Sequence, residues 1–204
     1  MKMPHHRLAV FSSASVVVVA LSCAQSPTTP SVGSQHAVIS DPIGDVVADP
    51  RIAVSPDLAS ATVDVANGNV TFVVQFAPGT VDPSTTWVRI ELDSDQNSAT
   101  GNREQNGMGS DYDLLLLANG KTASVQTYDP ARFNPADVCP ICVGQVPITF
   151  TGDTLQVSVP LSMLASNRDG HLSFLVKTWP VVNGQSLVDL IDFMPNITLP
   201  AARI

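Results

Sequence analysis

Hydrophobic and polar positions alternate with a period of two through much of the chain beyond residue 60. Each alternating run is short and ends at Gly, Pro, Asn or Asp, which is the pattern of β-strands separated by turns. The strongest candidates are residues 61–66, 70–76, 87–92, 112–118, 122–128, 146–150, 154–159, 172–179 and 186–193. We therefore expect about nine strands and little helix.

The turn residues indicate how these strands are connected. Candidate hairpin turns lie at Asn67-Gly68, Asn119-Gly120 and Gly152-Asp153. Asn-Gly between alternating runs is the strongest short hairpin signal, because both residues tolerate a positive φ. Residues 114–117 are apolar on both faces, which places their strand in the middle of a sheet. One helical turn is expected at residues 160–165, which begin with proline.

The order of these elements predicts the fold class. No alternation of strands with long helices appears, and no internal repeat of 20–50 residues is present. We expect an all-β protein with an antiparallel two-sheet β-sandwich, in the style of a jelly roll or an immunoglobulin domain. This single domain would occupy residues 37–204.

The first 22 residues resemble the signal peptide of a bacterial lipoprotein. A basic start is followed by a mostly apolar run at residues 8–21, too short to span a bilayer as a helix. Ala20-Leu21-Ser22-Cys23 resembles a lipobox, which implies cleavage before Cys23 and lipid attachment to its sulfur. The alternative is a plain signal peptide cut nearby, with Cys23 left as a free thiol.

Residues 23–36 are rich in Ser, Thr and Pro and are expected to form a flexible tether. The resemblance implies a protein exported to the bacterial cell envelope and anchored to the membrane through lipid. Because Ala24 rather than Asp follows Cys23, it also implies the outer membrane if the host has one.

The other two cysteines, Cys139 and Cys142, enclose Pro140 and Ile141. In an oxidising compartment such a pair is either disulfide-bonded or redox-active. A redox site favours a first cysteine at a helix N-terminus, whereas the residues on both sides here are typical of loops and turns. A structural Cys139–Cys142 disulfide is therefore the favoured interpretation.

Composition and charge narrow the range of partners. The formal net charge is −8 over 204 residues, and Asp supplies all the acidic residues except Glu91 and Glu104. An acidic surface repels phosphate backbones, so we expect no nucleic-acid partner. Asp is favoured in turns and in calcium-binding loops.

The loop at residues 93–104 carries the densest set of oxygen donors. Ca²⁺ takes six to eight oxygen ligands, and donors at alternating positions let a tight loop surround it. Candidate ligands are Asp93, Asp95, Asn97 and Glu104, of which Glu104 is the least certain. The spacing follows an EF-hand loop, but Ser98 replaces its glycine and the flanking residues indicate strands. We therefore predict calcium on a β scaffold.

Asp111 is a further candidate ligand from the start of the next strand. If the strands on either side of the loop pair antiparallel, its carboxylate lies near Asp93 and Asp95. Crowded carboxylates repel, and a divalent cation removes that cost. The alternative is an acidic, solvated turn in which Asp and Asn side chains cap backbone groups.

These segments resemble a family of bacterial extracytoplasmic domains. The stretches "LDSDQNSATG" and "GSDYDLLL", with "DPIGDV" at residues 41–46, are similar to DOMON-like and family-nine carbohydrate-binding-module-like domains. The resemblance covers residues 41–195 and implies a calcium-stabilised sandwich that sometimes holds a sugar or haem. It implies ion ligands at Asp93, Asp95, Asn97 and Asp111. It does not supply a ligand pocket.

Three functions are compatible with the sequence. A binding module, with carbohydrate as a candidate ligand, could stack sugars on Trp87 and Trp179, although both could instead fill the core. A structural or assembly lipoprotein of the envelope would bind another protein and need no small ligand.

An enzyme is disfavoured, because the predicted mature chain has only His36 and His171 and lacks a hydrolase motif. A glycan-acting hydrolase that uses two carboxylates remains the less favoured alternative.

Overall fold

The computed structural model describes residues 34–103, 107–128, 141–165, 167, 170–196 and 199–204. All of them belong to one compact unit, Val32–Ile204. The predicted signal peptide, Cys23, Glu104 and Cys139 lie outside the described residues. The first strand begins at Gln35, slightly before the predicted start of the domain at residue 37.

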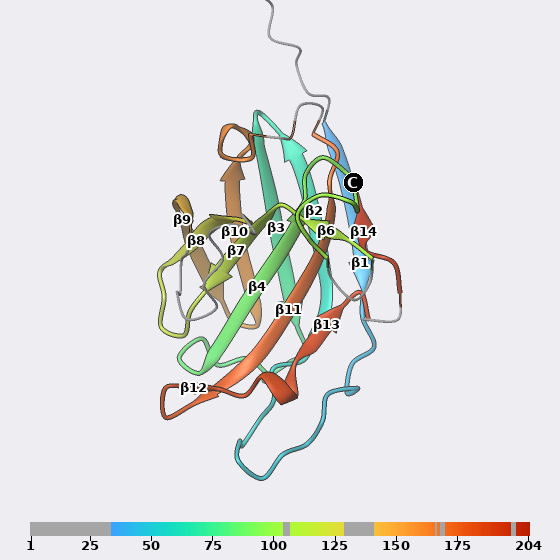
Figure 1. Cartoon of the computed structure of the whole chain (residues 1–204). Helices are drawn as coiled ribbons and strands as arrows, with labels where there is room; N and C mark the ends of the chain where they lie inside the picture. Colours follow the sequence, from blue (N-terminus) through green and yellow to red (C-terminus); the bar gives the residue numbers. More distant parts are fainter. Residues whose placement is uncertain (1–33, 104–106, 129–140, 166, 168–169, 197–198) are drawn as a thin grey trace, which may run out of the picture. The chain divides into compact units, whose positions relative to one another are not determined.

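Antiparallel β-strands dominate the described part of the chain, so the predicted all-β class is confirmed (Figure 1). The strands are β1 (Gln35–Ser40), β2 (Leu58–Ala66), β3 (Asn69–Phe76), β4 (Thr86–Asp93), β5 (Asn102–Arg103), β6 (Gly109–Ser110), β7 (Tyr112–Leu116), β8 (Thr122–Thr127), β9 (Cys142–Thr151), β10 (Thr154–Pro160), β11 (Ser173–Val182), β12 (Gln185–Ser186), β13 (Asp192–Met194) and β14 (Ala202–Arg203). The helical elements described are two 3₁₀ turns, η1 (Leu161–Met163) and η2 (Val188–Leu190).

Twelve of these strands form one continuous sheet, whereas the sequence predicted two sheets with about nine strands in all. The order along the sheet is β1-β2-β3-β10-β9-β8-β7-β4-β11-β12, and β13 and β14 also pair with β11. Strands β5 and β6 form a separate pair. Part of the excess over nine comes from short strands at the edges and in loops, which carry too few residues to show a period.

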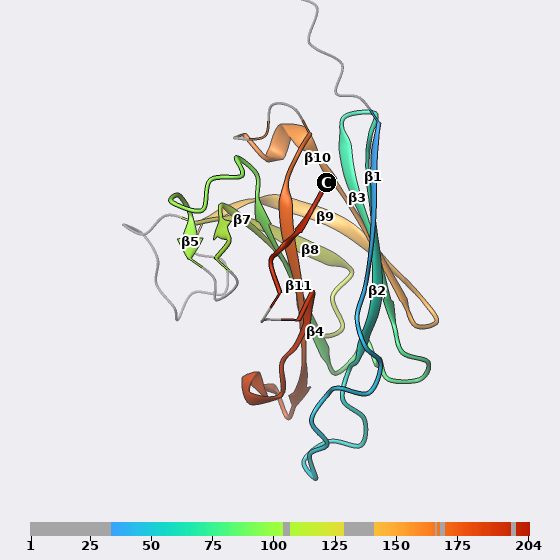
Figure 2. The same cartoon turned by 90° about the vertical axis from the view of Figure 1, so that its right-hand side faces the viewer.

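Strand β9 makes the sheet continuous. Its residues 142–147 pair with β8, and its residues 148–151 pair with β10. The sheet curls along this strand, so that β1, β2 and β3 stand opposite β4 and β11 (Figure 2). We call the side built on β1, β2, β3 and β10 the first half, and the side built on β8, β7, β4 and β11 the second half.

The hydrophobic core lies between the two halves. In β3, Val70, Phe72, Val74 and Phe76 are fully buried, which follows the predicted alternation. Phe72 meets Phe174 of β11 edge to face, with ring centroids 5.6 Å apart. Burial of such aromatic and aliphatic surface contributes roughly 25 cal/mol per Å² removed from water and stabilises the curl.

The hairpin predictions differ in their outcome. Asn67-Gly68 joins β2 to β3 with both residues at positive φ, as predicted. The connection at Asn119-Gly120 is longer than predicted, because β7 ends at Leu116 and β8 begins at Thr122. As expected, β7 is a central strand between β4 and β8.

The C-terminal segment is more broken than predicted. The expected strand at residues 186–193 is divided into β12, η2 and β13. A further Asn-Gly turn, Asn183-Gly184, joins β11 to β12 with both residues at positive φ. That turn carried the same sequence signal as the hairpin at Asn67-Gly68. The predicted helical turn at residues 160–165 is the short η1.

Candidate metal centre

The loop between β4 and β7 is folded tightly at the end of the second half. Strands β5 and β6 pair within it, so the chain doubles back on itself. A Cβ atom on Gly101 would lie 2.3 Å from the backbone oxygen of Ser110, and one on Gly109 would lie 2.3 Å from that of Thr100. Only glycine fits at these two crossings, which hold the ends of the loop together.

This folding brings Asp93, Asp95 and Asp111 together. One carboxylate oxygen from each of the three lies within 4.8 Å of those of the other two. Asp93 ends β4, and Asp111 immediately precedes β7, whose pairing with β4 places these two residues at the same edge of the sheet. We call Asp93, Asp95 and Asp111 the loop cluster. It could hold a metal ion.

Hydrogen bonds fix the carboxylates of the loop cluster. The Asn97 N–H donates to Oδ1 of Asp93 at 3.1 Å and to Oδ1 of Asp95 at 2.9 Å. Oδ2 of Asp111 accepts hydrogen bonds from both the backbone N–H and the hydroxyl of Ser94, each at 3.0 Å. These donors are neutral, so they orient the acidic groups without cancelling their charge.

The electrostatics of the loop cluster reflect burial and crowding. Asp93 is buried, and desolvation together with the nearby Asp111 and Asp95 raises its pKa to about 6, although the hydrogen bond from Asn97 opposes the rise. Burial also raises the pKa of Asp111. Asp95 is exposed and faces solvent beside these two carboxylates.

The other predicted ligands behave differently. The side-chain oxygen of Asn97 accepts a hydrogen bond from the Ala99 N–H at 3.1 Å, so it caps a turn within the loop. Its backbone N–H, rather than its amide oxygen, is the group that contacts the loop cluster. Glu104 lies outside the described residues and stays a prediction.

A small pocket opens beside Asp93. It has a volume of about 140 Å³ and is lined in part by Gln96, Ser98 and Met108, with Arg203 also in its wall. A space of this size holds several water molecules. Asp93 is therefore reached by solvent-sized species although its side chain is mostly covered.

Sequence reasoning missed a second acidic group. Asp41, Asp45 and Asp192 each place a carboxylate oxygen within 4.8 Å of those of the other two, so this group could also hold a metal ion. Asp57 lies beside them, because its Oδ2 accepts a hydrogen bond from the Gly44 N–H at 2.8 Å. We call Asp41, Asp45, Asp57 and Asp192 the four-aspartate cluster. Its only local sequence signal is the pair of Asp41 and Asp45 around a glycine.

Comparisons with known proteins leave the family open. No protein-family model matches the chain, and no curated protein matches its sequence. The resemblance to DOMON-like and carbohydrate-binding-module-like domains therefore stays a prediction.

The two candidate stacking residues lie against one another. Trp87 of β4 and Trp179 of β11 are direct partners in the sheet, and their ring centroids are 6.0 Å apart with planes tilted by 55°. Trp179 is buried, and the guanidinium carbon of Arg89 lies 6.0 Å from its ring centroid. Trp87 is only partly covered. The two rings thus form one joined surface instead of two separate platforms.

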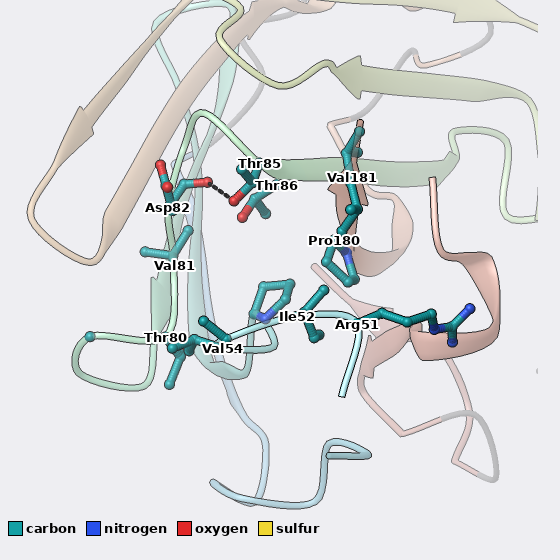
Figure 3. A pocket seen from close by; sticks show the side chains of 14 residues that line it. Arg51, Ile52, Val54, Thr80, Val81, Asp82, Thr85, Thr86, Pro180 and Val181 are labelled. Atoms are coloured by element: carbon teal, nitrogen blue, oxygen red, sulfur yellow. Dashed lines mark hydrogen bonds between the residues drawn. The ribbon is translucent and has the colours of Figure 1, made fainter. Parts of the chain in front are cut away.

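A larger pocket lies at the opposite end of β4 from the loop cluster (Figure 3). Its volume is about 320 Å³, within the range of small-molecule sites. Ile52, Val54 and Val81 supply apolar surface, while Thr85 and Thr86 supply hydroxyl groups. Sequence reasoning missed this pocket, because its walls come from residues 51–56, 79–86 and 180–182.

The predicted lipid anchor at Cys23 and one cysteine of the predicted disulfide lie outside the described residues. Cys142 begins β9, but its predicted partner Cys139 lies outside them. Within the described ranges, no helix combines the length and the apolar character required to cross a bilayer.

Proposed function

We propose that this chain is a binding module of the bacterial cell envelope, anchored through lipid on Cys23 and stabilised by calcium. The convergence of Asp93, Asp95 and Asp111 at one edge of the sheet carries the calcium part of the proposal. The lipobox-like sequence before Cys23 supports the anchor. The pocket of about 320 Å³ between residues 51–56, 79–86 and 180–182 supports a binding role.

Calcium is the cation that suits this donor set. The candidate ligands are carboxylate oxygens, and hard cations such as Ca²⁺ take oxygen ligands in flexible geometries. A bound divalent ion offsets the repulsion among the three carboxylates, which burial at Asp93 makes stronger. Calcium at this position would join the ends of β4 and β7.

Thermal unfolding of the purified full chain in calcium and in EGTA tests this site. Extracellular calcium modules have Kd values of about 10⁻⁴–10⁻³ M. At tenfold excess over such a Kd, calcium adds about 1.4 kcal/mol to the free energy of unfolding. We expect a higher melting temperature in calcium and a smaller difference in Asp95→Asn, since Asp95 is exposed and its replacement should leave the fold intact.

Asp64→Asn is the matched control, because it removes one carboxylate from β2, outside both clusters. It should keep the full response to calcium. Equal melting temperatures in calcium and EGTA for the unmodified chain would contradict a calcium site of this affinity.

Carbohydrate is the ligand class that this proposal assigns to the module. A glycan array probed with three forms of the full chain locates the binding surface. Trp87→Ala removes the more accessible ring of the tryptophan pair, whereas Val54→Trp fills the larger pocket from an exposed loop position. If one variant alone loses glycan binding, the surface changed in that variant is the binding surface. If both variants bind glycan as the unmodified chain does, neither surface is used. An array with no bound glycan contradicts the assignment.

The anchor is tested separately by labelling bacteria that express the full chain with radioactive palmitate. Label should enter the unmodified chain and be absent from Cys23→Ala. Incorporation into both forms, or into neither, would contradict lipid attachment at Cys23.

Exposed aliphatic side chains favour an assembly role as the second candidate function. Ile43, Val47 and Val54 in the connection between β1 and β2 are largely exposed, as is Val188 of η2. Apolar groups gathered on a surface are typical of protein contacts. A photo-crosslinker at position 47 in living cells should then capture a specific envelope protein. The same crosslinker at Val38, an equally exposed valine of β1, should not capture it.

A further inference from the structure

The four-aspartate cluster gathers residues from distant parts of the chain. Asp41 directly follows β1, Asp57 directly precedes β2, and Asp192 begins β13. Asp45 lies in the connection between β1 and β2, drawn in blue to teal at the bottom of Figure 1. Because β1 and β2 belong to the first half while β13 pairs with β11 of the second, this cluster lies where the two halves meet.

Three of the four side chains are buried. Asp41 is 8% exposed, Asp57 is 3% exposed and Asp192 is 5% exposed, whereas Asp45 is open to solvent. Burial of a carboxylate is expensive unless a positive charge or a set of hydrogen bonds compensates it. The ion pairs found among the described residues do not include any of these four aspartates.

Hydrogen bonds satisfy only part of the cluster. Both oxygens of Asp192 accept backbone N–H groups, from Leu58 at 2.6 Å and from Phe193 at 2.8 Å. The Asn196 side-chain amide donates to Oδ1 of Asp41 at 3.3 Å and to Oδ2 of Asp45 at 3.0 Å.

Two buried oxygens are left over. Oδ2 of Asp41 and Oδ1 of Asp57 are inaccessible to solvent and have no hydrogen-bond partner among the described residues. A buried acceptor without a partner costs about 1–3 kcal/mol, and more when it is charged. Because Asp41 faces the carboxylates of Asp45 and Asp192, its unpaired charge lies within the cluster.

The same crowding is reflected in the pKa values. Burial, together with the charges of Asp192, Asp45 and Asp57, raises the pKa of Asp41 to about 7. Burial and the neighbouring acids also raise the pKa of Asp192 to about 6. Protonation of the carboxylates or binding of a cation can relieve this repulsion.

We propose that Asp41, Asp45 and Asp192, with the buried oxygen of Asp57 beside them, form a second site for a hard divalent cation of the calcium type. The all-oxygen donor set suits Ca²⁺ better than Zn²⁺, which takes mainly nitrogen and sulfur ligands. The ion supplies a positive charge, which no ion pair among the described residues brings to these carboxylates. It ties the connection between β1 and β2 to β13.

This site also bears on the larger pocket. Arg51, Ile52 and Val54 belong to the same connection between β1 and β2 and form one wall of that pocket. Arg51 is itself held by Asp49 at 2.8 Å and by Asp189 of η2. A cation at the four-aspartate cluster holds both ends of this connection, since Asp41 and Asp57 flank it. Cation binding therefore restricts the pocket wall.

Equilibrium dialysis of the purified full chain against radioactive calcium tests the second site directly. With both clusters occupied, the unmodified chain binds two ions, one at each cluster. We expect Asp45→Asn to bind one ion, Asp95→Asn to bind one ion, and the double variant to bind none. Asp64→Asn should still bind two.

The variants separate the two sites. If Asp45→Asn binds as many ions as the unmodified chain, the second site is overturned whatever happens at Asp95. If Asp95→Asn binds as many ions as the unmodified chain but Asp45→Asn binds one fewer, the calcium site of the proposed function fails while the second site stands. Circular dichroism of each variant in EGTA confirms that the fold is retained.

A second variant keeps the test decisive at a buried position. In Asp41→Asn an amide replaces the unpaired carboxylate, so the repulsion falls and a donor to the neighbouring acids is gained. We expect its melting temperature to exceed that of the unmodified chain in EGTA and to fall below it in calcium. Lower stability in both conditions, with two ions still bound, would mean that Asp41 is only structural and would overturn the proposal.

Discussion

The loop cluster and the four-aspartate cluster differ in how the chain assembles them. The loop cluster takes its three carboxylates from one connection, between the end of β4 and the start of β7, within the second half of the sheet. The four-aspartate cluster takes its carboxylates from the two ends of one connection and from β13, which is far away in the sequence. It joins the two halves.

This difference predicts different energetic roles. An ion in the loop cluster closes a short segment, so its loss should loosen that segment while the core remains folded. An ion in the four-aspartate cluster links residues separated by most of the domain. Its loss should therefore lower the stability of the packing between the halves. The hydrogen bond from the Leu58 N–H to Asp192 already makes this link without an ion.

Phe72→Ala should have the largest effect, because it removes a fully buried ring that packs on Phe174 across the core. We expect a loss of about 4 kcal/mol in the free energy of unfolding, measured by urea denaturation. Val73→Ala, on the partly exposed face of β3, is the control and should cost much less. Equal losses of stability in Phe72→Ala and Val73→Ala would contradict the packing of Phe72 in the core between the halves.

Gly109→Ala should damage the loop cluster. The added Cβ would lie 2.3 Å from the Thr100 backbone oxygen and 2.7 Å from that of Asn97, so the loop must move. We expect the free energy of unfolding to fall by about 3 kcal/mol. Calcium binding should be lost at this cluster alone. Gly107→Ala is a control in the same loop, where no atom crowds the new Cβ and the positive φ is the only source of strain. Similar losses in both variants would show that the crossing is not tight.

A comparison of Asp192→Ala with Asp45→Ala in EGTA separates the contribution of hydrogen bonding from that of ion binding. The buried Leu58 N–H and the Phe193 N–H lose their acceptor, so we expect a loss of about 2 kcal/mol by urea denaturation without any metal. Asp45→Ala should be neutral or slightly stabilising in EGTA, because the exposed Asp45 mainly repels its neighbours. An equal loss in the two variants would contradict this division of roles.

Hydrogen exchange should distinguish the two ions. At tenfold excess over Kd, each ion adds about 1.4 kcal/mol to the stability of the segment that it binds. In Asp95→Asn, calcium should slow amide exchange in residues 41–57 and in β13. In Asp45→Asn, it should slow exchange in residues 94–103. Mass spectrometry of peptides from these segments makes the measurement. Protection spread identically over both segments in both variants would refute separate sites.

Local patterns account for the parts of the structure that the sequence predicted. Strand alternation in β2 and β3 and the turn at Asn67-Gly68 depend on residues close together in the chain. The loop cluster belongs to the same class, because Asp93 and Asp95 are neighbours and Asp111 needs only one pairing, that of β4 with β7, to reach them. Asn97 shows the limit of spacing arguments, since its side-chain oxygen caps the turn at Ala99.

Taken alone, the sequence determined the all-β class, the antiparallel pairing of neighbouring strands and the loop that gathers Asp93, Asp95 and Asp111. A period of two and turn chemistry act over a few residues, so they are visible without a fold. Only the tertiary structure decided that β9 joins both halves into one curled sheet. It also decided that Asp192 meets Asp41 and Asp45, because that contact requires the core to bring β13 beside the end of β1.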